Sequence, residues 1–203
     1  MKKGLKSRAL AYLENYGGPE LTAETKASIA AKKIVLEDEP LYIRTKITGG
    51  GEIELLTSTL DESVGITNID KKKLPKFVNF ILSRIQFGYG ASLIANASVP
   101  VDVQYASLIS GVPIVLQHAD LIIKQNGNPI ITMPIKALLS QEKQREFEGD
   151  GGYELDYMRL IKEEVPFQIS IKFPDGKALD PATNHHFVEV FLKGARTRLR
   201  GAK

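Results

Sequence analysis

The sequence predicts an all-β protein, an antiparallel sandwich or barrel preceded by a helical N-terminal arm. Three observations lead to this fold class. Apolar and polar residues alternate with a period of two in several segments after residue 40, and turn residues separate most of these segments. Clear helical spacing is confined to the N-terminal arm, apart from one ambiguous stretch at residues 76–90. Counting the segments gives about eight strands, the composition of a sandwich or barrel. A length of 203 residues suits one domain with an appended terminal segment.

Residues 1–39 predict a basic, helical N-terminal arm. Leu5, Tyr12 and Leu13 recur at helical spacing, and the Gly-Gly-Pro of residues 17–19 ends that helix. A second short helix is expected after Thr22, a residue type that caps helix N-termini. Neither helix carries enough apolar residues to form a core, so we expect the arm to pack against something else.

Residues 40–203 are expected to form the β-sandwich domain. Residues 76–90 fit either a helix or a strand, and their Phe, Val and Ile content with a Gly-Tyr-Gly ending favours a long strand. Prolines at 100 and 113 stand where strands can begin, because a first residue needs no ladder N–H. The predicted strands cover residues 41–48, 52–60, 76–90, 100–108, 113–125, 128–135, 165–173 and 185–199.

The segment LIIKQNGNPIITMPI (121–135) predicts a two-residue hairpin. Asn126 and Gly127 are the pair that best tolerates the positive φ angles of a type I′ turn. Such a turn would place Gln125 opposite Asn128, Ile123 opposite Ile130 and Ile122 opposite Ile131. Because Ile122 and Ile123 then point to opposite sides, both faces of the hairpin are expected to be covered, and we assign Ile122 and Ile131 to subunit packing.

Residues 136–164 show no strand pattern. The stretch QEKQREFEGDGGYELDYM is charged and rich in glycine, and it predicts a mobile surface excursion at about residues 140–160.

The sequence contains no pattern that predicts chemistry. It has no cysteine, His185 and His186 leave a strand from opposite faces, and the triplet Gly49-Gly50-Gly51 and the pair Gly88 and Gly90 read as turn glycines without a phosphate-loop context. We therefore predict that the protein is not an enzyme and has no catalytic residue, no metal site, no cofactor and no small-molecule substrate.

Basic residues gather at both ends of the chain, although the net charge is only +3. These residues could contact phosphate or an acidic neighbour. An equally good interpretation is that they belong to frayed chain ends and increase solubility. On a continuing strand the three C-terminal arginines share one face, where salt bridges between subunits, solvation and nucleic-acid backbone contact are the alternatives. The candidates for contact with a genome or an inner face are Lys2, Lys3, Lys6, Arg8, Arg196, Arg198 and Arg200. No stretch of about 18 apolar residues predicts a transmembrane segment, and no secretory signal is expected.

Several segments resemble capsid-type proteins of icosahedral tailless phages. The resemblance lies in HADLIIKQNGNPIITMPIKALL, LIKEEVPFQISIKFPDG, HHFVEVFLKGARTRLR and LPKFVNFILSRIQFGYG, and it covers about residues 65–200. It implies a jelly-roll-like antiparallel sandwich of about eight strands. The chain is shorter than the double jelly-roll major capsid proteins and has room for one jelly roll.

The resemblance also implies a function. The protein would be a virion structural protein, at a capsid or vertex position, that builds an icosahedral shell after assembly in the host cytoplasm. Its partners would be copies of itself and other shell proteins, with non-specific genome contact through the basic termini. Subunit packing would use Leu5, Tyr12 and Leu13 of an arm that orders on a neighbour, together with Ile122 and Ile131. The alternative is a non-viral β-sandwich module that binds protein or carbohydrate.

Overall fold

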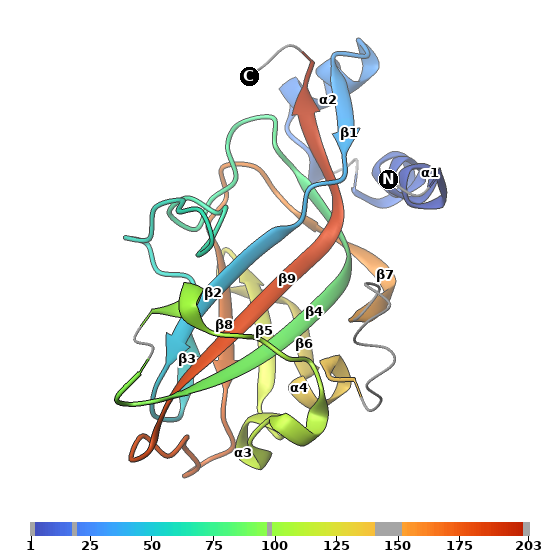
Figure 1. Cartoon of the computed structure of the whole chain (residues 1–203). Helices are drawn as coiled ribbons and strands as arrows, with labels where there is room; N and C mark the ends of the chain where they lie inside the picture. Colours follow the sequence, from blue (N-terminus) through green and yellow to red (C-terminus); the bar gives the residue numbers. More distant parts are fainter. Residues whose placement is uncertain (1–2, 18–19, 97–98, 141–151, 201–203) are drawn as a thin grey trace.

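The protein, analysed as a computed structural model, is a two-layered antiparallel β-sandwich with helices at its N-terminal end (Figure 1). The structure describes residues 3–17, 20–96, 99–140 and 152–200. The helices are α1 (Lys3–Tyr12), the π-helical turn η1 (Leu13–Gly17), α2 (Ala23–Ala30), the 3₁₀ turns η3 (Pro100–Asp102) and η4 (Ile109–Gly111), α3 (Ile114–Gln117) and α4 (Ile135–Leu138). The strands are β1 (Ile34–Glu37), β2 (Leu41–Ile47), β3 (Glu52–Glu54), β4 (Phe80–Leu93), β5 (Asp120–Gln125), β6 (Asn128–Pro134), β7 (Tyr153–Ile161), β8 (Phe167–Lys172) and β9 (Asn184–Leu199).

The strands form a large sheet in the order β1-β9-β4-β7, with β2 also paired to β9, and a small sheet in the order β3-β8-β5-β6. The chain doubles back at the β5–β6 hairpin, and the two halves then pair antiparallel as β4 with β7, β3 with β8 and β2 with β9. The β4–β9 and β5–β8 pairs close this double ribbon on itself. A folded ribbon rolled into two sheets is a jelly roll, so the predicted all-β, jelly-roll-like class is confirmed.

The core lies between the two sheets and follows from the alternation of each strand. In β2 the inward residues Leu41, Ile43 and Ile47 are buried, while Tyr42 and Arg44 point to the outer face. The same rule buries the inward residues of β8 and β9, which are Phe167, Ile169, Ile171, Val188, Val190 and Leu192. Burying each such side chain contributes about 1.5–3 kcal/mol, so this single interface dominates the stability of the fold.

The central hairpin forms where it was predicted but with a different register. Asn126 and Gly127 have φ angles of 51° and 78°, as a type I′ turn requires, and Gln125 lies opposite Asn128. Beyond Lys124 and Pro129 a bulge inserts Ile130, so that Ile123 lies opposite Ile131 and Ile122 opposite Thr132. The predicted Ile123–Ile130 and Ile122–Ile131 pairs are therefore wrong. The bulge turns Ile131 into the core, and alternation alone cannot reveal such an extra residue.

One predicted strand is absent from the described residues, and another begins later than predicted. In place of a strand at 100–108 the chain forms η3 and two isolated bridges, Tyr89 with Ala106 and Leu108 with Ser140. Residues 113–119 contain α3 instead of a strand start, with Pro113 at the helix N-cap, and the strand begins only at Asp120. A proline that tolerates a missing N–H at a strand start tolerates it equally at a helix start, so the residue type did not discriminate.

Strands β1 and β7 were not predicted from the sequence. The predicted excursion at about 140–160 falls partly on residues 141–151, which lie outside the described residues, but residues 153–161 form β7 at the edge of the large sheet. Its burial follows no simple alternation, because Leu155, Met158, Leu160 and Ile161 are all buried. The β4–β7 register shift between Leu82 and Arg84 accounts for this irregular pattern.

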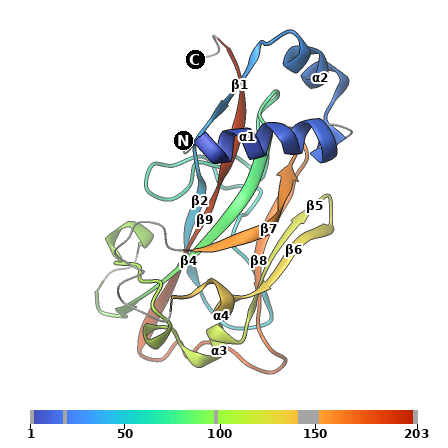
Figure 2. The same ribbon diagram turned by 90° about the vertical axis from the view of Figure 1, so that its right-hand side faces the viewer.

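The N-terminal segment packs on the outer face of the large sheet of its own chain (Figure 2). Leu13 and Leu21 contact a cluster in which Ile81 of β4 and Leu160 of β7 point away from the core. Thr22 caps α2 as predicted, since its side chain accepts the Thr25 N–H. The arm is not helical throughout, because β1 pairs with the end of β9 and extends the sheet.

Candidate functional site

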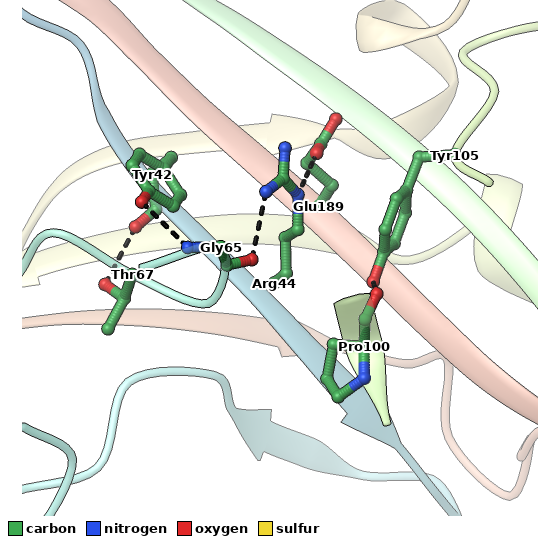
Figure 3. Close-up of polar contacts among 7 residues, drawn as sticks. All are labelled: Tyr42, Arg44, Gly65, Thr67, Pro100, Tyr105 and Glu189. Atoms are coloured by element: carbon green, nitrogen blue, oxygen red, sulfur yellow. Dashed lines mark hydrogen bonds and ion pairs between the residues drawn. The ribbon is translucent and has the colours of Figure 1, made fainter. Parts of the chain in front are cut away.

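A polar cluster on the outer face of the large sheet is centred on Arg44 (Figure 3). The alternation of β2 places Arg44 outward, directly opposite Glu189 of β9, and its Nε donates to the Glu189 carboxylate. Its Nη1 donates to the carbonyl oxygen of Gly65 at 2.9 Å. The guanidinium therefore ties the loop at residues 63–67 to the sheet.

Aromatic rings surround the same guanidinium. Its carbon lies 5.5 Å from the ring centre of Tyr42, 5.6 Å from that of Phe191 and 5.9 Å from that of Tyr105. At this range each ring attracts the cation through its quadrupole. Glu189 keeps only 12% of its side chain exposed and Arg44 27%, so solvent screens the ion pair only in part.

Two glycines of β4 let a second loop lie on this face. A Cβ on Gly90 would stand 2.4 Å from Val103 Cγ1 and 2.6 Å from the Gln104 oxygen, and one on Gly88 would stand 3.2 Å from Tyr105 Cβ. The prediction that Gly88 and Gly90 are turn glycines is wrong, because both lie inside a strand where the backbone of residues 103–106 approaches closely.

The hydroxyl of Tyr105 fixes the start of this second loop. It donates to the Pro100 oxygen at 2.8 Å, and burial, with the neighbouring Glu189 charge, raises the pKa of Tyr105 to about 12. The phenol is therefore neutral at physiological pH and is a poor base. Chemically, the Arg44 cluster (Tyr42, Arg44, Tyr105, Glu189 and Phe191) holds two loops on the sheet.

A second polar cluster anchors the N-terminal helices. The carboxylate of Glu163, only 3% exposed, accepts hydrogen bonds from Thr22 Oγ1 at 2.8 Å, from Thr25 Oγ1 and from the backbone N–H of Phe77. Burial raises the pKa of Glu163, but these donors outweigh burial and hold the pKa below its ordinary value. Phe77 has a left-handed φ of 64°, which the contact with Glu163 stabilises.

The C-terminal arginines that were predicted to contact phosphate are engaged in ion pairs within the chain. Arg196 pairs with Glu39 at 2.7 Å and Arg198 with Glu37 at 3.3 Å. Both line a cavity of about 440 Å³ at the β1 end of the sandwich, whereas Arg200 is exposed beyond the end of β9. These pairs lie within one chain, so they are not the salt bridges between subunits that were considered, and contact of these arginines with nucleic acid stays a prediction.

The other predicted site residues are distributed over several regions. Asn126 and Gly127 form the hairpin tip, and Ile122 and Ile131 of that hairpin are buried within the chain itself. Leu13 is buried where the arm contacts the large sheet, and Tyr12 packs against the same apolar cluster. Arg8 pairs with Glu154 at 2.7 Å. Lys2, and the side chains of Lys3, Leu5 and Lys6, lie outside what the structure describes.

Sequence reasoning missed both polar clusters. Glu163 and Arg44 stand in ordinary charged contexts. Thr22 lies 141 residues from Glu163, and Glu189 lies 145 residues from Arg44, so no local spacing indicates these contacts. A useful signal in retrospect is Gly88 with Gly90, since glycine inside a strand pattern indicates a close backbone approach.

Three further findings concern chemistry and comparison. Within residues 3–17, 20–96, 99–140 and 152–200, no three His, Asp or Glu side chains are grouped to hold a metal ion. No helix in this described part is long and apolar enough to cross a membrane. Searches against protein-family models and against curated proteins gave no match.

Proposed function

We propose that the protein is a structural subunit of an icosahedral virion shell, at a capsid or vertex position, which assembles in the host cytoplasm by packing against copies of itself and other shell proteins. The observation that carries the proposal is the strand order, β2-β9-β4-β7 facing β3-β8-β5-β6, which is that of a single jelly roll. Viral capsid proteins are a major class built on this architecture. Because lectin domains and cupins share it, the fold needs support from surface features.

Apolar side chains on the loops give that support. Val64 is 97% exposed, Ile114 72% and Val101 53%. The loops of Val64 and Val101 adjoin, since a Cβ on Gly65 would stand 3.0 Å from Val101 Cγ1, and adjoining exposed apolar side chains are typical of surfaces that other proteins cover. The other large apolar residues that are exposed in the described part of the chain are Leu10, Leu93, Ile94, Val99 and Tyr157.

The basic residues contribute less to the proposal than the sequence implied. Arg8, Arg196 and Arg198 each have a carboxylate partner in the same chain, which reduces the charge that they offer to a genome. Protein–protein packing is therefore the main role that we propose, and genome contact at the chain termini is secondary.

Light scattering of the purified protein, followed by negative-stain electron microscopy, tests this function. We expect defined oligomers or closed shells whose fraction increases with protein concentration. A monodisperse monomer at every concentration and salt level would contradict the proposal and favour the alternative, a β-sandwich binding module. A glycan or peptide that binds the monomer would further support that alternative.

A further inference from the structure

The helical arm, which runs from α1 to the end of α2, covers an apolar patch on the outer face of the large sheet (Figure 2). The arm contributes Ala9, Leu13 and Leu21 to this contact. The patch on the sandwich consists of Ile81, Met158, Leu160 and Ala195. Exposing these side chains to water would cost hydrophobic stabilisation. The patch therefore needs an arm, but that arm need not belong to the same chain.

Polar contacts make the patch specific for this arm. Three ion pairs join the two parts, each between one cation and one carboxylate. They are Arg8 with Glu154 at 2.7 Å, Glu20 with Lys162 at 2.7 Å and Glu24 with Lys76 at 2.6 Å. The buried Glu163 carboxylate also accepts hydrogen bonds from Thr22 and Thr25. All these partners of the arm lie on the sandwich, so the arm of a second, identical chain would make the same contacts.

The connection between the arm and the sandwich is short and contains a strained residue. Residues 31–33, which we call the hinge, separate α2 from β1. The hinge reverses the chain, because the Lys33 N–H donates to the Ser28 oxygen at 2.9 Å. Lys32 has a left-handed φ of 56°, at a position after a helix where glycine is the usual residue. An extended hinge would relieve this strain.

We propose that two copies of this chain exchange their helical arms, so that each arm docks on the large sheet of the other copy. Opening the hinge lets Lys32 become extended, while the contacts of each arm are recovered on the partner. Short, strained hinge loops favour such domain swapping. Three extended residues span about 10 Å, so the two hinges must lie close together in the dimer. The inference rests on the proposed function, for which it specifies one contact between subunits.

Substitutions at Lys32 test the hinge without changing the docking surface. Lys32→Gly removes the strain of the closed turn, and because each dimer contains two hinges it should weaken dimerisation at least about tenfold. Light scattering after refolding from urea at increasing protein concentration measures this change. Lys32→Pro cannot adopt a positive φ, so the dimer should become the main species. Glu164→Gly is the matched control and should leave dimerisation unchanged, because Glu164 is exposed and also has a φ of 56° but lies outside the hinge.

Charge reversal distinguishes arm exchange from any other dimer. The variant R8E/E20K/E24K reverses three charges of the arm, and the variant K76E/E154R/K162E reverses their partners on the sandwich. Each variant alone places like charges opposite one another, whereas in an exchanged heterodimer the pairs of both arms have opposite signs. A one-to-one mixture refolded together at low salt should therefore contain at least about tenfold more heterodimer than homodimer. Native mass spectrometry resolves these dimers by mass.

The outcomes separate this inference from the proposed function. If the wild type assembles but the Lys32 variants behave like it, or the mixture gives dimers in statistical proportion, arm exchange is overturned and the shell function stands. If the heterodimer predominates but the wild type forms nothing larger than a dimer, arm exchange is supported and the shell function is overturned. Monomeric wild type and monomeric Lys32→Pro under all conditions overturn both. Predominant heterodimer together with larger wild-type assemblies supports both.

Discussion

The outer faces of the two sheets differ in what covers them. On the large sheet, the N-terminal helices cover Ile81 and Leu160, and two loops held by the Arg44 cluster cover the region around Gly88 and Gly90. The small sheet presents ion pairs to solvent, Lys124 with Glu52 and Lys72 with Glu54. The large sheet therefore lies between the small sheet and a covering layer of the same chain, whereas the outer face of the small sheet is exposed to solvent.

This difference teaches that a strand with apolar residues on both faces does not require a neighbouring subunit. The sequence analysis expected neighbouring copies to cover such strands. In the described residues, the chain itself covers the apolar outer residues of β4 and β7. The large apolar side chains that remain exposed in the described residues lie mostly in loops and short helical turns, and Val64 is the most exposed of them.

The largest expected effect comes from detaching the helical cover of the large sheet. Glu163→Gln removes the charge that accepts hydrogen bonds from Thr22, Thr25 and the Phe77 N–H, and we expect a loss of about 1.5–3 kcal/mol in the free energy of unfolding. Urea denaturation measures the loss, and limited proteolysis should show earlier cleavage near residue 20. Glu164→Gln, one residue away and exposed, is the control and should change neither.

A slightly smaller effect is expected where the second loop lies on β4. Gly90→Ala places a methyl group against Val103 and the Gln104 carbonyl, which should lower the free energy of unfolding by about 1–3 kcal/mol. Gly111→Ala serves as the control, because a Cβ at Gly111 meets nothing within 4 Å. Equal stability of the two variants in thermal denaturation would mean that residues 103–106 do not rest on the sheet.

Ion pairs on the outer faces of the two sheets should contribute different amounts to the free energy of unfolding. Arg44→Met leaves Glu189, which is 12% exposed, without its partner, and we expect a loss of about 1–2 kcal/mol. Lys124→Met removes the partner of Glu52, which is 41% exposed, and should cost under about 1 kcal/mol. Urea denaturation of both variants makes the comparison, and a larger cost for Lys124→Met would reverse the assignment of covered and bare faces.

The smallest effect concerns the titration of two carboxylates. Hydrogen bonds from Lys124 and Ser170 lower the pKa of Glu52, whereas Glu163 has a lowered pKa despite burial. Adding salt to 1 M should raise the pKa of Glu52 towards its ordinary value and leave that of Glu163 nearly unchanged, because salt screens exposed charges more strongly than buried ones. Carboxyl NMR signals followed from pH 2 to 7 measure both. A pKa of Glu163 that moves as far as that of Glu52 would contradict its burial.

The lowered pKa of Glu163 also has a defined consequence for stability. Because the folded pKa lies below the unfolded value of about 4.3, the ionised carboxylate stabilises the fold fully above that value. This contribution is lost as pH falls through the folded pKa. The stability difference between the wild type and Glu163→Gln should therefore be largest near neutral pH and disappear in acid.

Local chemistry was sufficient for several elements of the fold. Asn126-Gly127 has few alternatives to a type I′ turn, Thr22 has the side chain that caps a helix, and the alternation of residues 41–47 fixes which face is buried. The long strand predicted at 76–90 also formed, with bounds shifted to 80–93. These features depend on φ preferences and on side-chain periodicity, both of which act within a few residues.

Other features depended on contacts that the sequence does not display. The bulge at Ile130 and the strand at 153–161 break the alternation on which strand prediction relies. Glu163 and Arg44 acquired their roles only when the roll brought distant segments together.

The sequence by itself determined the class of the fold, the position of the central turn and the strands that alternate cleanly, because those follow from local backbone and side-chain preferences. The tertiary structure alone decided what covers each sheet and which charges are paired. Those outcomes depend on which of many chemically equivalent apolar and charged residues the rolled ribbon places side by side.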